Sequence, residues 1–180
     1  MDKKVEAYIR AGSDGALERL RRLCAQPSVS AYGHGIHECA QLVKEMMEEL
    51  GAEVSLTPAP ESGYPVIYGE IKGRSDRTVL FYDHYDVQPP EPLELWTSPP
   101  FEPVVREGRL YGRGVSDDKG SIAVRLAAVE AFVRAGGGLP CTVKFFLEGE
   151  EEIGSPHLAQ VVQDHAQLLK ADGCIWEVEE

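Results

Sequence analysis

Three groups of potential metal ligands follow three apolar, strand-like segments of this sequence. His84 and Asp86 come directly after TVLFYD, Asp117 and Asp118 lie in GRGVSDDKG, and a run of glutamates ends CTVKFFLEGEEE. In a parallel α/β sheet the carboxyl ends of the strands share one edge, and ligands bind along that edge. We therefore expect the imidazole and the carboxylates to meet there and to bind divalent cations.

Each group alone also fits a simpler interpretation. His84 and Asp86 face the same way on a strand-like segment and can make ordinary turn hydrogen bonds. The Asp117-Asp118 pair precedes a helical pattern and fits a helix N-cap. The glutamates fit a solvated acidic turn. The metal site is favoured because all three groups end adjacent β segments, so all three simpler interpretations would have to hold together.

The residue types indicate hydrolytic chemistry. One bridging carboxylate with flanking His and Glu ligands can hold two zinc ions about 3.5–4 Å apart, and such a pair acidifies a water molecule. A glutamate that is not a ligand can then move the proton of that water. Glu148, Glu150, Glu151 and Glu152 are crowded, and their mutual repulsion also favours a bound cation. A phosphate loop is disfavoured because its glycine motifs are absent, and the spacing of the acidic residues excludes an EF-hand.

The composition is that of one ordinary globular domain. The 180 residues are 43% hydrophobic and 27% charged, enough to form a core. A net charge of −12 argues against a nucleic-acid binder. The sequence has neither a signal-like segment nor a membrane-length apolar run, so we expect a cytoplasmic protein with no membrane partner. Its four cysteines show no CxxC pairing, and we expect free buried or half-buried thiols.

The pattern of elements predicts an α/β fold. Apolar spacing predicts helices from Val5 to Leu23 and from Cys39 to Leu50. Three β segments follow: AEVSLT at an edge, VIYGEI, and TVLFYD at the centre. Residues 88–113 are Pro-rich and irregular, as in functional loops. A helix over 118–135, the strand CTVKFFLEG, a helix over 155–170 and the strand GCIWEV complete the alternation. This order favours three α/β/α layers around a mostly parallel sheet.

HYDVQP, GRGVSDDKG and EGEEEIGS, taken in this order, resemble the motifs of the cocatalytic-zinc metallopeptidases. That family includes carnosinase-like dipeptidases, glutamate carboxypeptidases, acetylornithine deacetylase and succinyl-diaminopimelate desuccinylase. The resemblance runs from about Leu17 to the end of the chain, and it implies a zinc-exopeptidase-like fold. Gln88-Pro89 and the segment WTSPPFEP are most similar to the dipeptidase branch.

The resemblance implies a role for each residue of the site. His84 would bind one zinc, with Asp86 as its orienting partner, and Asp117 would bridge both metals. Glu151 would be the general base, and Glu152 would bind the other zinc. In the same family a non-proline cis peptide joins the two aspartates of the second motif. Glu150 is then only a neighbour of the catalytic pair.

A further acidic ligand is expected on the last strand. Glu177 is our choice, but Glu179 lies on the same face of a strand, so spacing cannot decide between them. His157 and His165 fall on the predicted helix over 155–170, and we expect them to be surface or packing residues. Family members are considerably longer than this chain. The resemblance therefore implies that residues 1–180 are the N-terminal part of a catalytic domain and lack a lid or dimerisation domain and a C-terminal catalytic segment.

The predicted function is metal-dependent hydrolysis of a peptide or amide bond, most simply by a dipeptidase. Zinc is the metal that the resemblance implies, and Co2+ or Mn2+ also suit a mixed His/carboxylate site. The substrate would be a small peptide or an N-acyl amino acid, and the full-length relative would form a homodimer. An N-acyl-amino-acid deacylase or desuccinylase shares these motifs. A non-catalytic metal-binding or interaction module derived from the hydrolase is the other alternative. We expect the isolated chain to be inactive because it lacks the last histidine ligand.

Overall fold

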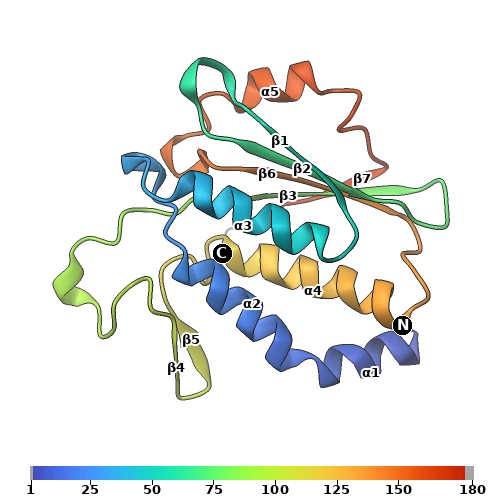
Figure 1. The fold of residues 1–180 in the computed structure, drawn as a ribbon, viewed down its shortest axis with the longest axis horizontal. Helices are drawn as coiled ribbons and strands as arrows, with labels where there is room; N and C mark the ends of the chain where they lie inside the picture. The colour runs from blue at the N-terminus through green and yellow to red at the C-terminus, as the bar shows by residue number, and fades with distance from the viewer. Residues whose placement is uncertain (1, 177–180) are drawn as a thin grey trace.

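The structure, a computed structural model, describes residues 2–176 (Figure 1). Its helices are α1 (Lys3–Ala11), α2 (Ser13–Ala25), α3 (Ile36–Glu48), α4 (Lys119–Ala135) and α5 (Leu158–Asp164). Its strands are β1 (Glu53–Thr57), β2 (Val66–Ile71), β3 (Thr78–His84), β4 (Val104–Arg106), β5 (Arg109–Tyr111), β6 (Thr142–Glu148) and β7 (Gly173–Ile175).

The main sheet has the strand order β1-β2-β6-β3-β7. β6 and β7 both pair with β3 in parallel, and β2 pairs antiparallel with both of its neighbours. Only β2 therefore runs against the other strands, which confirms the predicted α/β fold with a mostly parallel sheet. The expected edge position of AEVSLT and the interior position of TVLFYD are also confirmed.

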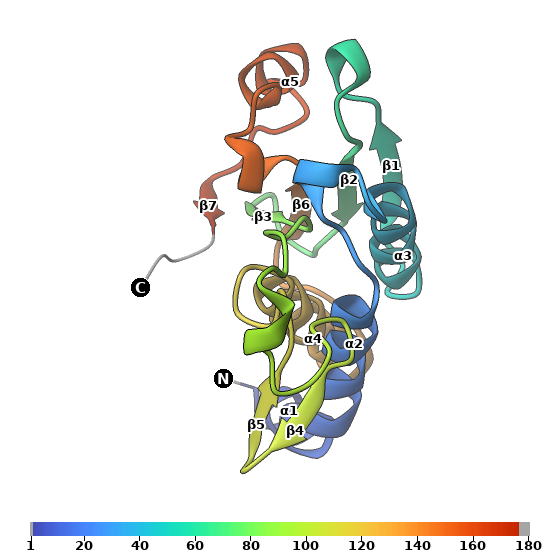
Figure 2. The same cartoon turned by 90° about the vertical axis from the view of Figure 1, so that its left-hand side faces the viewer.

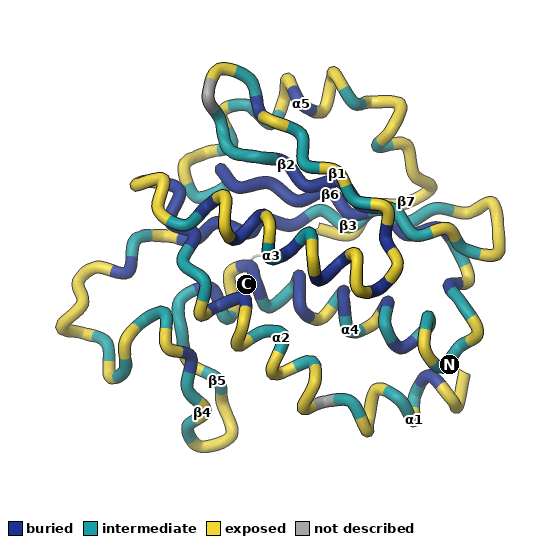
Figure 3. Tube along the Cα trace, in the orientation of Figure 1, coloured by how far each residue is buried: buried dark blue, intermediate teal, exposed yellow. Residues whose placement is uncertain are grey.

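Helices cover the two faces of the sheet unequally. Figures 1 and 2 show α3 and α4 on one face, with α1 and α2 packed beyond α4, and α5 on the other face. Phe145 and Phe146 are neighbours on β6, so their side chains point to opposite faces. Phe145 joins the large core beneath α3 and α4, whereas Phe146 joins a smaller core with Val161 of α5. The buried positions recur along α3 and α4 in Figure 3.

Two helices differ from the prediction. The first is divided at Gly12, which caps α1 and precedes α2. The last covers only Leu158–Asp164 instead of 155–170. After α5 the chain turns back, and the side-chain amine of Lys144 on β6 donates hydrogen bonds to the carbonyls of Leu168 and Lys170. These two hydrogen bonds hold residues 168–170 against β6, where the sequence predicted the end of the helix.

Residues 88–113 form an arm that projects from the domain (Figure 1). It carries the small hairpin β4–β5. The arm is closed at its base by Arg113, whose backbone N–H donates to the carbonyl of Pro100 at 2.8 Å and whose side chain donates to that of Pro89 at 2.9 Å. The Arg113 guanidinium also lies 5.4 Å from the centre of the Trp96 ring. The predicted irregular loop is thus an ordered excursion with a fixed base.

The four cysteines are free thiols, as predicted. Cys24 and Cys39 are buried and Cys141 is half-buried, but Cys174 is exposed because it lies on the outer strand β7. Burial raises the pKa of the Cys24 thiol to about 11. Among residues 2–176, no helix is both long and apolar enough to cross a membrane.

Leu126 and Val124 of α4 provide a test of the packing. Leu126 is completely buried in the large core, whereas Val124 is 68% exposed on the same helix. We expect Leu126→Ala to lower the free energy of unfolding by about 3 kcal/mol, since it leaves a cavity. Val124→Ala should change it by less than about 0.5 kcal/mol. Urea unfolding followed by circular dichroism measures both, and equal losses would contradict this packing.

Candidate metal centre

The parallel pairing of β3 with β6 brings the first and third motifs together. In this register the last residue of β3, His84, lies opposite the last residue of β6, Glu148. The segments that follow the two strands therefore leave the sheet at the same edge. Asp117 reaches this edge from the turn before α4. One ligand atom from each of His84, Asp117 and Glu152 lies within 4.8 Å of the others, so the predicted convergence is present.

His84 has its two ring nitrogens in different surroundings. The residue is 1% exposed, and its Nδ1 lies 3.1 Å from the carbonyl oxygen of Asp86 and 3.3 Å from Oδ1 of the same residue. Its Nε2 points into the site, 2.9 Å from Oδ1 of Asp117. A neutral imidazole that donates its Nδ1–H to Asp86 keeps the Nε2 lone pair for a metal ion.

Asp86 connects the histidine to the glutamates. Its carboxylate is fully buried and accepts the backbone N–H groups of Glu151 at 3.2 Å and Glu152 at 3.0 Å. Asp86 thus contacts the imidazole mainly through its backbone carbonyl and holds the turn of Glu151 and Glu152 through its carboxylate. This position agrees with the orienting role expected for Asp86, and that role stays a prediction.

Asp117 and Asp118 have different surroundings. The predicted cis peptide joins them. Asp118 is 2% exposed and occupies the N-cap position of α4, yet its side chain makes no capping hydrogen bond. Its Oδ2 instead accepts the backbone N–H of His84 at 3.3 Å. The side chain of Asp117 is 68% exposed and faces the His84 ring, where a cation can reach it.

Gln88 holds the carboxylate of Glu152. Its backbone N–H donates to Oε1 of Glu152 at 3.1 Å, and its side-chain amide donates to Oε2 at 2.6 Å. Burial raises the pKa of the Glu152 carboxyl above its ordinary value, the nearby carboxylates add to this shift, and the Gln88 hydrogen bond opposes it. In the sequence, Gln88 was notable only because Gln88-Pro89 is similar to the dipeptidase branch of the family. No spacing rule reveals a partner 64 positions away.

The crowded glutamates separate into different environments. Glu148 is 2% exposed and accepts hydrogen bonds from the hydroxyls of Tyr82 and Ser155, and burial raises the pKa of its carboxyl. Glu150 is 4% exposed, and its carboxylate lies against Nδ1 of His157 at 2.9 Å. Glu151 and Glu152 remain half-buried at the site, with Oε2 of Glu151 at 3.7 Å from Nε2 of His84. Because the four carboxylates lie in different environments, the repulsion between them is partly relieved.

The donor set fits a divalent cation. One imidazole nitrogen and carboxylate oxygens of Asp117 and Glu152 converge on a point that is partly exposed. Mixed nitrogen and oxygen donors of this kind suit zinc, cobalt or manganese. Glu177, the further ligand expected from the sequence, lies outside the described residues, as does its alternative Glu179.

Curated relatives include two kinds of hydrolase. The chain is 37% identical over 140 residues to a succinyl-diaminopimelate desuccinylase from Dechloromonas aromatica, an overlap of 78% of this chain and 36% of the relative. It is 35% identical over 136 residues to a cysteinylglycine-S-conjugate dipeptidase from Corynebacterium striatum, an overlap of 75% of this chain and 30% of the relative. The chain thus spans about a third of the length of these relatives.

Solved structures show the same fold. A metallo-carboxypeptidase of the M20 family from Sulfolobus solfataricus matches 91% of this chain with a TM-score of 0.86 and 39% identity. Human carnosine dipeptidase 1 matches 97% with a TM-score of 0.89 and 29% identity. The matched parts are 37% and 40% of those two chains. The model of peptidase family M20/M25/M40 matches residues 80–179, more than half of this sequence. The chain therefore belongs to peptidase family M20/M25/M40, in agreement with the resemblance carried by its three motifs.

Proposed function

We propose that this chain contributes the metal centre of a hydrolase that cleaves a peptide bond, with a dipeptide as the substrate. One observation carries the proposal. Donor atoms of His84, Asp117 and Glu152 converge within 4.8 Å of one another, and a further carboxylate, that of Glu151, stands beside them. A ligand set with a spare base at its side is what metal-assisted hydrolysis requires.

The proposed ligands divide between two metal ions. His84 and Glu152 would each hold one ion, Asp117 would contribute its carboxylate to both, and Glu177 would be a further ligand. When bound, the zinc pair supplies Lewis acidity, which lowers the pKa of a water molecule and polarises the scissile carbonyl. The chain's own residues must then fix these ligands in position. The backbone carbonyl of Asp86, which accepts from the His84 ring, and the amide of Gln88, which donates to Glu152, support that task.

Glu151 is the proposed general base. Its carboxylate is half-buried at the site, and its backbone N–H is fixed by Asp86. From this position it takes a proton from the attacking water and returns it to the leaving nitrogen as the C–N bond breaks. Asp86 acts through His84 and through the Glu151–Glu152 turn, so we assign it a positioning role.

A second substrate class is an N-acyl amino acid such as an N-succinyl compound. The match to a desuccinylase at 37% identity favours it, while the match to a dipeptidase at 35% identity and the Gln88-Pro89 and WTSPPFEP segments favour the dipeptide. Both reactions cleave a C–N amide bond and make the same demands on the metal ligands. The substrate must therefore be distinguished by assay.

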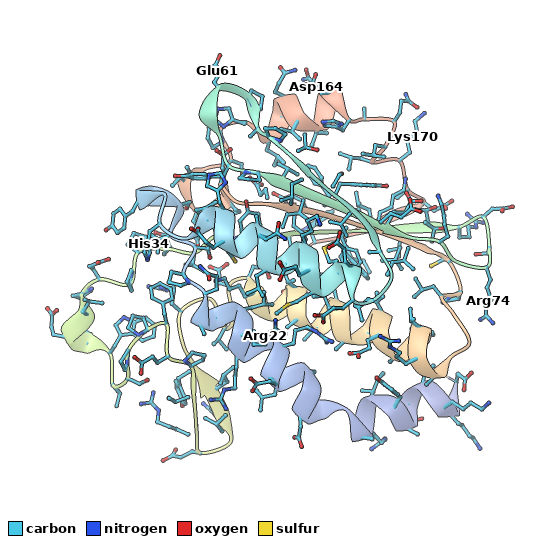
Figure 4. The ribbon with its side chains drawn as sticks, viewed as in Figure 1. Arg22, His34, Glu61, Arg74, Asp164 and Lys170 are labelled. Carbon is cyan, nitrogen blue, oxygen red and sulfur yellow. The ribbon has the colours of Figure 1, made fainter. Side chains whose placement is uncertain are left out.

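His84 provides the first test of the metal centre. We expect Co2+, used as a spectroscopic substitute for Zn2+, to bind the chain, and His84→Ala to weaken that binding by at least about tenfold through loss of a ligand. The matched control is His34→Ala, since His34 is exposed in the loop before α3 (Figure 4). Titration followed by the visible Co2+ absorption measures both. Equal affinity in the two variants would contradict the assignment.

Glu151 and Glu152 provide a second test because they are adjacent but have different proposed roles. Glu152→Gln should weaken metal binding by at least about tenfold, because an amide is a poor ligand in place of a carboxylate. Glu151→Gln should leave the affinity within about threefold, since Glu151 is a base and not a ligand. Calorimetric titration with Zn2+ gives both constants. The reverse order would exchange the two roles.

Hydrolysis is the direct test of the function. The described residues supply three donor groups to a proposed two-metal centre, so we expect the 180-residue chain to bind metal without robust turnover. Strong dipeptide hydrolysis by this chain would contradict that expectation. In the natural full-length protein, parallel assays of dipeptides and of N-succinyl and N-acetyl amino acids identify the substrate class. Metal binding without hydrolysis of any of them would favour a non-catalytic module.

A further inference from the structure

Buried Glu150 and half-buried His157 form a pair beside the turn that carries Glu151 and Glu152. We propose that this pair positions the Glu151–Glu152 turn for metal binding and for proton transfer. The inference rests on the proposed function, because it assigns a purpose to residues that touch no ligand. From the sequence, Glu150 was expected to be only a neighbour of the site and His157 a surface or packing residue.

The contacts of Glu150 hold the turn at its first residue. The carboxylate accepts the backbone N–H of Tyr64 at 3.0 Å and lies 2.9 and 3.1 Å from Nδ1 of His157. The backbone carbonyl of Glu150 accepts the N–H groups of Ile153 at 3.2 Å and Ser155 at 2.8 Å. Both the side chain and the main chain of Glu150 therefore tie the turn to its surroundings.

The loop between β1 and β2 leaves room for this pair. A Cβ atom added at Gly63 would lie 2.6 Å from Nδ1 of His157 and 2.9 Å from Oε1 of Glu150, closer than real contacts allow. The next residue, Tyr64, donates its hydroxyl to the carbonyl of Ser30 at 2.8 Å, which anchors the loop on its other side. The pair thus sits in a tightly packed space against a fixed loop.

The turn is consequently held from two sides. On one side the carboxylate of Asp86 receives the N–H groups of Glu151 and Glu152, and on the other side Glu150 is held by Tyr64 and His157. Removal of the imidazole would take one hydrogen-bond donor from the carboxylate of Glu150, which is 4% exposed, and would leave it the N–H of Tyr64 among the described residues. A buried carboxylate that loses a donor is destabilising. Glu150 would then rotate toward water and loosen the turn that follows it.

The test compares the two histidines at the ends of α5. His157 is the N-cap residue of this helix and His165 is its C-cap residue, so His165→Ala controls for a general loosening of α5. In His157→Ala we expect amide hydrogen exchange over residues 149–155 to rise about tenfold and Co2+ affinity to fall about tenfold, the lower end of the range for groups that orient metal ligands. His165→Ala should change neither by more than about twofold.

A conservative variant separates positioning from mere stability. His157→Asn places an amide donor where Nδ1 of the imidazole lies, so it should restore most of the exchange protection and of the Co2+ affinity. Equal exchange over residues 149–155 in His157→Ala and His165→Ala would overturn the proposal. If the parent chain bound no Co2+, the proposed function would fall, and the exchange comparison, which needs no metal, would still decide whether the pair holds the turn.

Discussion

The parallel register between β3 and β6 is the constraint on which the site depends. It places the last residues of the two strands, His84 and Glu148, opposite each other, so that Asp86, Gln88 and Glu152 can meet just beyond the sheet. A slip of one residue would turn every side chain of one strand to the other face. The large core beneath α3 and α4 prevents that slip, because it would expose Phe145 and Leu147. The packing of the core thus also fixes the relative positions of His84 and of the turn that carries Glu152.

The edge of the sheet where β3 and β6 end also carries a high density of carboxylates. Four glutamates occur within five positions of the chain, yet each has its own surroundings. Burial raises the pKa of the Glu148 carboxyl, the hydroxyl donors Tyr82 and Ser155 oppose that shift, and Glu150 is paired with His157. The remaining carboxylates, those of Glu151 and Glu152 together with Asp117, surround one imidazole and retain a local excess of negative charge that a divalent cation would compensate.

Local sequence patterns predicted the fold and the convergence of the three motifs. They could not predict contacts between residues that are far apart in the sequence. Apolar periodicity located the strands of the main sheet and α4 but not the hairpin β4–β5, and three motifs pointed to His84, Asp117 and Glu152 as neighbours. Periodicity did not show that Gly12 divides the first helix or that α5 ends at Asp164. The contacts of Gln88 with Glu152 and of Tyr64 with Glu150 join residues far apart in sequence, and only tertiary packing creates them. Glu177 stays a prediction.

The arm of residues 88–113 lies in the chain between the first two proposed ligands, His84 and Asp117, but it is joined to the site only at its base. Arg113 closes that base through the carbonyls of Pro89 and Pro100. The arm therefore behaves as an inserted module. A change of length or sequence at its tip would leave the bonds that Arg113 makes at the base, and the positions of His84 and Asp117, unchanged.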